Sequence, residues 1–333
     1  MNPFDYTRAD TLEAAVGADG AILAGGTNLL DLMKIGVATP SRLVDISRLP
    51  LREIDDHDGG LRIGAMVSNA DLARDPRILA RFPAVAEALL SGASPQLRNA
   101  ASTGGNVMQA TRCSYFQDPL SPCNRREPGS GCSAIGGVTR NHAILGWSDA
   151  CIATHPSDLC VALAAFDAVV HVAGPTGTRS VPMAVFHPLP DAVGVPPALS
   201  AEEVITHVTL PDPGGMARHA RYLKLRERTS YAFAIVSAAA GGHPPGPGRG
   251  RGPPVARPCG RGRPDRPARV RGGLCPRRRA GGAGCRAVGG QCRQDRAGTA
   301  DRPARADAGR TGHARSDAGA SRLCLRRRRP WLT

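Results

Sequence analysis

Apolar residues recur at two different spacings along the first 240 positions of the chain. Short apolar runs bounded by turn residues predict β-strands, whereas apolar residues at helical spacing predict helices. Strands are expected at 4–6, 21–23, 43–46, 51–54, 61–65, 169–172, 178–181, 203–210, 221–228 and 231–240. Helices are expected to begin near Thr11, Leu29, Asn69, Phe82 and Ser157. Small strands interspersed with helices indicate an α+β or α/β fold.

A glycine turn joins the expected strand at 21–23 to the helix that follows it. Its sequence is Ala24-Gly25-Gly26-Thr27-Asn28-Leu29-Leu30. The two glycines let the backbone approach a ligand closely, and the N–H groups of a first helical turn attract anions. Thr27 and Asn28 stand where N-cap residues belong. The stretch matches neither GxGxxG nor GxxxxGK[ST], so no nucleotide fingerprint applies, and an ordinary strand-to-helix turn is the alternative.

A second glycine turn, Ser102-Thr103-Gly104-Gly105-Asn106, precedes the apolar residues Val107 and Met108. With two such turns in one domain, each phosphate of a single ligand can meet a group of backbone N–H donors. A dinucleotide that carries a pyrophosphate is therefore the natural candidate. Two unrelated tight turns are the alternative.

Apolar periodicity is lost between positions 111 and 151, where four cysteines occur among Pro, Gly, Ser, Asn and Arg residues. A loop of this length without its own core needs something to hold it. An iron–sulfur cluster, a tetrahedral zinc ion, and disulfides or unrelated thiols are the alternatives. The gaps of 9, 8 and 18 residues contain no CxxC pair, which weakens the case for zinc, and no secretion signal supports disulfides. The cysteines are Cys113, Cys123, Cys132 and Cys151.

Several single residues outside the turns are candidates for a role. Asp158 follows Ser157 at the start of an expected helix, so helix capping and a hydrogen bond to a ribose-like hydroxyl both explain it. Lys224 is one of two lysines in the chain, and a solvated strand position is the alternative to a functional ammonium. Cys160 lies in an apolar run and is expected in the core. His142 and His155 are isolated, and no Ser/His/Asp triad is expected.

The net charge of +15 is confined to the last quarter of the 333 residues. Residues 1–240 hold 20 Lys plus Arg against 23 Asp plus Glu, whereas residues 241–333 hold 23 Arg against 5 Asp. The tail is rich in Arg, Gly, Pro and Ala and lacks apolar periodicity, so no core is expected there. A disordered RNA-binding arm, a disordered linker and an out-of-frame translation product are the alternatives. The abrupt end of the apolar run at 231–240 favours the out-of-frame product.

The chain shows neither an N-terminal signal peptide nor an apolar stretch long enough to span a membrane. No membrane span is therefore expected.

These residues together resemble the FAD-binding (medium) subunits of the xanthine dehydrogenase and molybdenum hydroxylase family, and within it the YagS-type flavin subunits of periplasmic aldehyde oxidoreductases. The resemblance runs from residue 1 to about residue 240 and stops at the Arg-rich tail. It is carried by the first glycine turn with its helix, Gln96-Leu97-Arg98-Asn99, Thr103-Gly104-Gly105-Asn106, the four-cysteine loop, Ala153-Thr154-His155-Pro156-Ser157-Asp158 and Arg226-Glu227-Arg228-Thr229-Ser230-Tyr231-Ala232-Phe233.

The resemblance implies an α+β fold with a two-lobed FAD-binding domain of the PCMH/vanillyl-alcohol-oxidase type. This domain would cover residues 1–190, with an iron–sulfur loop at 111–151, and a flavoprotein C-terminal domain would begin at 198–240. The four cysteines would bind a [4Fe–4S] cluster. Lys224 would lie near the isoalloxazine ring. The implied FAD-binding residues are Ala24, Gly25, Gly26, Thr27, Asn28, Leu29, Leu30, Ser102, Thr103, Gly105, Asn106, Asp158 and Lys224.

The implied function is electron transfer within a molybdenum hydroxylase of aldehyde oxidoreductase or xanthine dehydrogenase type. A large subunit would carry the molybdenum cofactor and a small subunit the [2Fe–2S] clusters, and no nucleic acid would be a partner. The complex would be cytoplasmic, or periplasmic by export with a partner that bears a signal. The alternative is a zinc-stapled nucleic-acid-binding protein with an Arg/Gly-rich arm, which explains the tail but leaves both glycine turns without a purpose.

Overall fold

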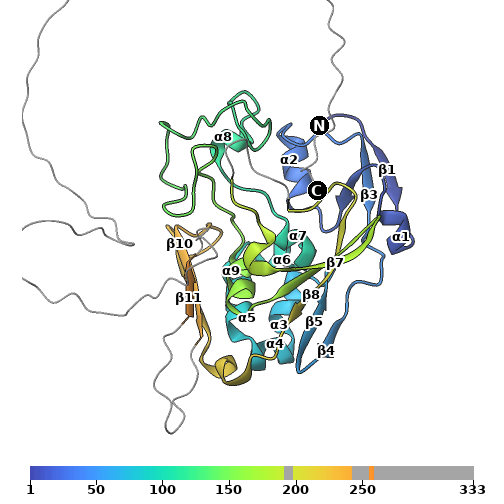
Figure 1. Ribbon diagram of the computed structural model, residues 1–333, viewed down its shortest axis with the longest axis vertical. Helices are drawn as coiled ribbons and strands as arrows, with labels where there is room; N and C mark the ends of the chain where they lie inside the picture. The colour runs from blue at the N-terminus through green and yellow to red at the C-terminus, as the bar shows by residue number, and fades with distance from the viewer. Residues whose placement is uncertain (191–197, 242–254, 259–333) are drawn as a thin grey trace, which may run out of the picture. The chain divides into compact units, whose positions relative to one another are not determined.

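The computed structural model describes residues 1–190, 198–241 and 255–258 (Figure 1). Its largest sheet has five antiparallel strands in the order β4-β5-β8-β6-β7. They are β4 (Ile54–His57), β5 (Gly60–Gly64), β8 (Val204–Leu210), β6 (Val169–Gly174) and β7 (Gly177–Pro182). The centre of the sheet therefore joins β5 to a strand that lies about 140 positions later in the sequence, with Leu61 opposite Leu210.

A second sheet is formed by the N-terminal segment and is parallel. Strand β3 (Arg42–Asp45) lies between β1 (Asp5–Arg8) and β2 (Ala21–Leu23), so that Leu43 pairs with both Tyr6 and Ala21. Helices α1 (Leu12–Ala15) and α2 (Leu29–Lys34) connect these strands. The expected strands at 4–6, 21–23 and 43–46 and the helices near Thr11 and Leu29 are thus present, within one or two positions.

Helices cover one face of the five-stranded sheet (Figure 1). Phe82, at the start of α5, meets Phe166, at the end of α9, edge to face with ring centroids 5.2 Å apart. Both aromatic side chains belong to the main hydrophobic core, which also contains Leu61 and Val208 of the sheet. Side-chain caps start five of these helices, from Ser68, Asp75, Ser94, Ser102 and Ser157. The helices are α3 (Asn69–Arg74), α4 (Pro76–Arg81), α5 (Pro83–Ser91), α6 (Pro95–Ala100), α7 (Thr103–Val107) and α9 (Asp158–Ala165).

A third, antiparallel sheet follows the 3-10 helix η1 (Gly214–His219). Its strands are β9 (Arg221–Leu225), β10 (Val236–Gly241) and β11 (Val255–Pro258). Two predictions need correction here. The strand expected at 221–228 ends at Leu225, and the strand expected at 231–240 begins only at Val236, because the intervening residues turn back along the pocket described below.

The loop at 111–151 has little regular structure beyond α8 (Ser114–Gln117) and is held by buried polar side chains. Arg126 donates hydrogen bonds to the carbonyls of Tyr115 (2.9 Å), Phe116 (2.6 Å) and Asp118 (2.5 Å). Asn124 donates to the carbonyl of Ala150 at 2.9 Å and so ties the interior of the loop to its C-terminal end. Helix α10 (Met183–Phe186) follows strand β7.

The linker predicted at 188–197 and the tail at 241–333 fall mainly outside the described residues. Within the tail the structure describes only Gly241 and strand β11, which pairs with β10. The expectation of a disordered or out-of-frame tail therefore stays a prediction. Among the described residues, no helix has the length and apolar character needed to cross a membrane.

Candidate functional site

The two glycine turns lie against each other. A Cβ atom at Gly25 would stand 2.1 Å from the carbonyl oxygen of Ala100 and 3.1 Å from the Cα of Ala101, so only glycine fits. Ala101 directly precedes the second turn. Gly26 has φ +70°, a left-handed conformation that also favours glycine. The first turn is therefore built from glycine because two backbones meet there.

The first turn contains hydrogen-bond donors and one acceptor that have no partner among the described residues. Within the described part of the chain, the N–H groups of Gly25, Gly26, Thr27 and Asn28 have no backbone acceptor. Asn28 is the N-cap of α2, but its side chain makes no capping hydrogen bond, and its Oδ1 atom is buried without a partner. A buried polar atom of this kind is costly unless a ligand or water satisfies it.

The second turn is the first turn of helix α7, and its donors are already occupied. The N–H groups of Thr103 and Gly104 donate to the carbonyls of Val67 and Ala65, at 2.9 Å and 2.8 Å. Those of Gly105 and Asn106 donate to Ser102. The expectation that both turns offer free N–H groups therefore holds only for the first turn. The residues just before this turn, Ala100 and Ala101, supply the surface on which Gly25 packs.

Asn106 connects the second turn to helix α9. Its Oδ1 atom accepts hydrogen bonds from Ser157 Oγ and Gln109 Nε2, both at 2.7 Å. Ser157 caps α9 by accepting from the N–H of Cys160, so the cap of this helix is Ser157 and not Asp158. Asp158 is consequently left to make other contacts.

Asp158 is bound on both carboxylate oxygens by residues of β9. Oδ2 lies 2.7 Å from Lys224 Nζ, and Oδ1 accepts from the hydroxyl of Tyr222 at 2.5 Å. The Lys224 ammonium also donates to the carbonyl of Ser91 at 3.1 Å. The alternative of a solvated strand lysine is therefore wrong, and the expected place of Lys224 near the isoalloxazine ring stays a prediction. Lys224 is a buried ion-pair partner that fastens the third sheet to helix α9.

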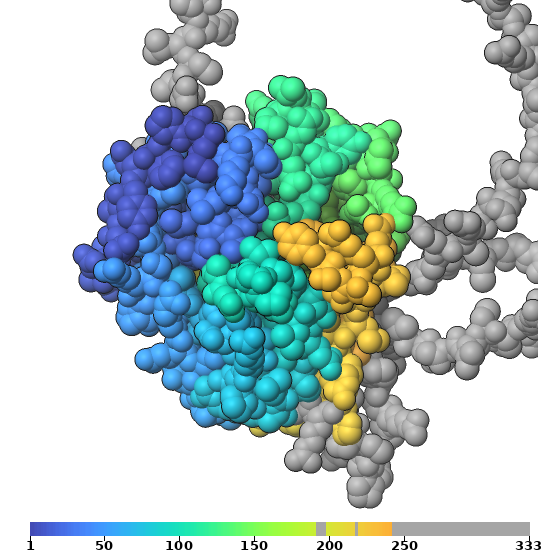
Figure 2. Space-filling view, turned by 180° about the vertical axis from the view of Figure 1, so that it is seen from behind, coloured from blue at the N-terminus to red at the C-terminus, as the bar shows by residue number. Residues whose placement is uncertain are grey.

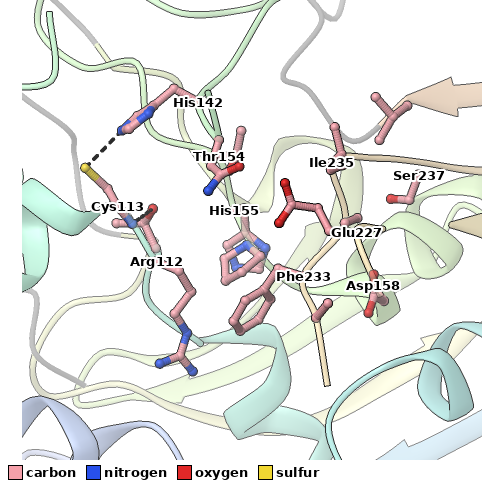
Figure 3. Close-up of a pocket in the computed structure, with 16 residues that line it drawn as sticks. Arg112, Cys113, His142, Thr154, His155, Asp158, Glu227, Phe233, Ile235 and Ser237 are labelled. Carbon is pink, nitrogen blue, oxygen red and sulfur yellow. Dashed lines mark hydrogen bonds between the residues drawn. The ribbon is translucent and has the colours of Figure 1, made fainter. Parts of the chain in front are cut away.

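A pocket of about 220 Å³ opens beside Asp158, between the four-cysteine loop and the segment before β10 (Figure 3). Arg112, Cys113 and His142 line it from the loop, and Phe233 and Ile235 line it from the other segment. Figure 2 shows the same neighbourhood from behind, where the orange 221–241 segment meets both the green loop and the cyan helices near residue 100. One expected cofactor residue, Asp158, thus lines the same pocket as the cysteine loop.

Arg112 enters this pocket, and among the described residues no carboxylate lies within ion-pair distance of it. Its guanidinium lies over the ring of Phe233, 5.2 Å from the ring centroid. Its Nε atom is buried and has no hydrogen-bond partner. Burial lowers the pKa of Arg112, and Asp31 and Tyr231 offset part of this decrease. A buried cation in such surroundings is costly unless an anion joins it.

The four loop cysteines are free thiols. Cys123 and Cys132 lie opposite each other in an isolated β-bridge. Burial raises the pKa of Cys113, and Cys123 and Cys151 raise it further. Burial also raises the pKa of Cys151, with smaller contributions from Cys132 and Cys123. Each thiol is thus within electrostatic reach of at least one other.

Two further side chains lie beside these thiols. His142 Nε2 is 3.1 Å from Cys113 Sγ, and burial lowers the pKa of this histidine (Figure 3). The Nε atom of Arg125 is buried without a hydrogen-bond partner. Burial lowers the pKa of Arg125, and Cys151, Cys123 and Cys113 are the groups that raise it. Among the described residues, the titratable groups that act on this half-buried arginine are therefore the cysteines.

A second group of metal-ligand side chains, His155, Cys160 and His187, lies beside α9 with ligand atoms within 4.8 Å of one another. The rings of His155 and His187 are in contact and tilted, with centroids 4.0 Å apart and planes at 31°. Two imidazoles on one tetrahedral ion would have centroids about 5 Å apart, given metal–nitrogen bonds of about 2 Å. This arrangement is a ring contact beside Cys160, which is buried in the core as expected.

Comparison with known proteins decides the family. The sequence model described as FAD binding domain in molybdopterin dehydrogenase matches residues 2–213, well over half of the chain. The chain belongs to this family. Its fold is the mixed helix-and-strand FAD-binding domain, as expected, and its relatives are subunits of oxidoreductases.

The similar proteins include the aldehyde oxidoreductase FAD-binding subunit PaoB of Escherichia coli (strain K12), which is 51% identical over 257 residues, covering 75% of this chain and 80% of that protein. The carbon monoxide dehydrogenase medium chain of Hydrogenophaga pseudoflava is 41% identical over 106 residues, or 32% of this chain and 37% of that one. The solved carbon monoxide dehydrogenase of this organism superposes with a TM-score of 0.53, 27% identity, and coverage of 74% of this chain and 71% of that chain. Quinoline 2-oxidoreductase from Pseudomonas putida 86 gives a TM-score of 0.54 at 25% identity, covering 77% and 73%.

The site fits the FAD of this family. The first turn offers four N–H groups and the buried Oδ1 of Asn28, and the pocket holds an arginine without an anion. The zinc-stapled nucleic-acid binder is not supported for the described region, because residues 2–213 match a family of FAD-binding domains.

Three residues of this FAD-binding domain were missed by sequence reasoning. Tyr222 alternates with Lys224 along β9, and a period-two pattern would have placed both on the buried face. Arg112 and Arg125 each lie within two positions of a cysteine. Nothing in the sequence shows that these two arginines, among so many, are buried without carboxylates.

Proposed function

We propose that this chain is the FAD-carrying electron-transfer subunit of a molybdenum hydroxylase that oxidises an aldehyde or a purine. The subunit receives electrons from a [2Fe–2S] small subunit, which takes them from the molybdenum-cofactor large subunit, and passes them to an external acceptor. The identity of 51% to an aldehyde oxidoreductase FAD-binding subunit supports the aldehyde reaction. Bound FAD supplies the redox chemistry, and the protein supplies binding and orientation.

One observation carries the proposal for the site: Gly25 packs directly on the Ala100 carbonyl, beside N–H groups that have no backbone acceptor. Such a contact brings the second turn next to the first without consuming the donors of the first. These donors bind the phosphates. The residues proposed to surround the cofactor are Ala24, Gly25, Gly26, Thr27, Asn28, Leu29, Leu30, Ser102, Thr103, Gly105, Asn106, Asp158 and Lys224.

Asp158 and Lys224 have a positioning role in this proposal. The ammonium and the Tyr222 hydroxyl hold the carboxylate in one orientation at the edge of the pocket. A carboxylate fixed in this way presents its remaining lone pairs to a hydroxyl of the cofactor chain. Both residues thereby also keep strand β9 against the pocket.

We also propose that Cys113, Cys123, Cys132 and Cys151 bind a [4Fe–4S] cluster. The buried Arg125 beside these thiols supports an anionic centre, since four thiolates on a cluster leave net negative charge. Zinc is less well matched. In the described part of the chain, no three of the four sulfurs lie within 4.8 Å of one another, whereas zinc–sulfur bonds of about 2.3 Å hold four sulfurs about 3.8 Å apart. In a cubane each thiolate binds a different iron, so the sulfurs stand farther apart.

The test is an absorption spectrum of the anaerobically purified full chain, with iron, zinc and acid-labile sulfide assayed alongside. Flavin bands and about four iron per chain are the expected result. Cys132→Ala should lose iron and sulfide and keep FAD. Cys160→Ala, the control, removes a thiol from the core instead and should keep FAD, iron and sulfide. A chain that holds zinc and no iron would contradict the cluster, and a chain that holds no flavin would contradict the proposed function.

The location of the complex belongs to the same proposal. It is cytoplasmic, or periplasmic by export with a signal-bearing partner. Fractionation of cells that express all three subunits decides between the two, and a chain found without its partners would contradict the assembly.

A further inference from the structure

The clue is a half-buried arginine that lines the pocket and has no counter-ion among the described residues. Other arginines of this chain show what such a side chain normally finds: Arg77 pairs with Asp75 at 2.8 Å, and Arg126 is surrounded by backbone carbonyls. Arg112 has neither. Its Nε atom is buried without a hydrogen bond, and the described contact of its guanidinium is with the face of Phe233.

A guanidinium that is removed from water needs an anion with matching geometry. Its planar fork matches the oxygens of carboxylates and phosphates, and it stacks on aromatic rings at the same time. Phe233 therefore accounts for one face of Arg112, and the edge that carries the N–H donors is left for a ligand. The cost of burying the unpaired cation makes this ligand an acid.

The direction of the side chain tells which part of the ligand it meets. Arg112 points away from Cys113 toward the blue N-terminal segment (Figure 3). The carboxylate that acts on it most is Asp31 of helix α2, the helix that follows the first glycine turn. The guanidinium therefore lies toward helix α2, which begins directly after the N–H groups of Gly25 to Asn28 that have no backbone acceptor in the described part of the chain.

We propose that Arg112 binds the diphosphate of the FAD, opposite the first glycine turn. The inference rests on the proposed function and adds to it a charged phosphate ligand that the glycine turns alone do not provide. Because Arg112 directly precedes Cys113, the residue that neutralises the diphosphate and the first thiol of the loop are consecutive in the chain.

The test compares two flavins on the full-length chain after its own flavin has been removed. FAD carries the diphosphate and riboflavin does not. Titration calorimetry should show that Arg112→Met weakens FAD binding roughly 10- to 100-fold, the usual worth of a charge-assisted hydrogen-bonded pair, and leaves riboflavin binding unchanged. Arg112→Lys should retain part of the affinity for FAD. Arg48→Met, which removes the same charge from an exposed position, should change neither affinity.

Each other outcome overturns the assignment. Equal weakening of FAD and riboflavin would place Arg112 on the ring or the ribityl chain, and unchanged FAD affinity in a variant with the wild-type circular dichroism spectrum would remove it from the site. If Arg112→Met does not fold, Arg112→Lys gives the same comparison. A wild-type chain that binds no FAD overturns the proposed function itself, so that the two failures are distinct.

Discussion

The ammonium of Lys224 lies 2.7 Å from a carboxylate oxygen of Asp158, and the two side chains are only 4% and 9% exposed. This ion pair joins residues 66 positions apart and fastens strand β9 to the first residue of helix α9. The other lysine of the chain, Lys34, forms a comparable pair with Asp31, but at 4.0 Å and with both side chains mostly exposed. The two pairs give a matched comparison of a buried and an exposed contact.

Lys224→Met should destabilise the protein by about 3–5 kcal/mol, because it leaves the Asp158 carboxylate buried without its cation. The double variant with Asp158→Asn should recover much of this loss. Lys34→Met should cost less than about 1 kcal/mol, as exposed pairs do. Urea unfolding of the three variants measures the differences. Equal effects of the two lysine substitutions would show that the buried pair contributes no more to stability than the exposed pair.

Gly25→Ala should separate the two glycine turns. The new methyl group would lie 2.1 Å from the Ala100 carbonyl oxygen, which is backbone and has to move. A cost of about 1–3 kcal/mol in the free energy of unfolding is expected, together with loss of FAD affinity. Gly241→Ala is the control, because its methyl group would meet side chains only at an ordinary 3.7 Å. Flavin retention on desalting and urea unfolding read the two effects, and normal flavin retention by Gly25→Ala would contradict the role of this contact.

Arg125→Met should lower the reduction potential of the proposed cluster. Reduction adds a negative charge, which the nearby guanidinium stabilises, so its removal favours the oxidised state. Each 1.4 kcal/mol of lost attraction lowers a one-electron potential by roughly 60 mV. Arg140→Met is the control in the same loop, because Arg140 is 72% exposed and pairs with Glu227. Redox titration followed by electron paramagnetic resonance gives the reduction potential of each variant. An unchanged potential in Arg125→Met would rule out the electrostatic role.

His207 should make the protein less stable in mild acid. Burial, with smaller contributions from His171, Arg62 and His57, lowers its pKa to about 4. Its ring stacks on that of His171 with centroids 4.1 Å apart. Because the unfolded chain binds the proton more readily, this stabilisation is complete above pH of about 6.5 and is lost as the pH falls toward 4.

The expected loss for His207 between pH 7.5 and 5 is about 1 kcal/mol, once the partial exposure of the ring is allowed for. Urea unfolding of the wild type and of His207→Asn at both values measures it. The variant should lose less stability than the wild type over this range. Identical losses would assign the pH dependence to other groups.

The sequence predicted most elements in the first 210 residues because their apolar spacing is regular. The hairpin of β6 and β7 and the strand β8 lie within a few positions of where they were expected. The short helices α4 and α6 were not expected, since six residues give too few turns for a periodicity to be read. The stretch 231–235 is apolar and was taken for part of a strand, but Phe233 packs on Arg112 at the pocket instead.

The sequence predicted the parts of the candidate site that depend on backbone geometry. It did not predict the parts that depend on the burial of charged side chains. The glycine pairs indicated close approach, and the structure brings Gly25 onto Ala100. The sequence could not show that the N–H groups of the second turn are used by Val67 and Ala65, because those acceptors lie some 40 positions away. Nor could it separate Arg112 from the exposed arginines, since burial depends on the tertiary fold.

The pairing of β5 with β8 fixes an order of events during synthesis. The centre of the largest sheet cannot form until Leu210 has been synthesised and can pair with Leu61. Long-range pairing of this kind is slow. All four loop cysteines lie between these two residues in the sequence. On the ribosome they are made, and their thiols are open to metal donors, before the sheet can close.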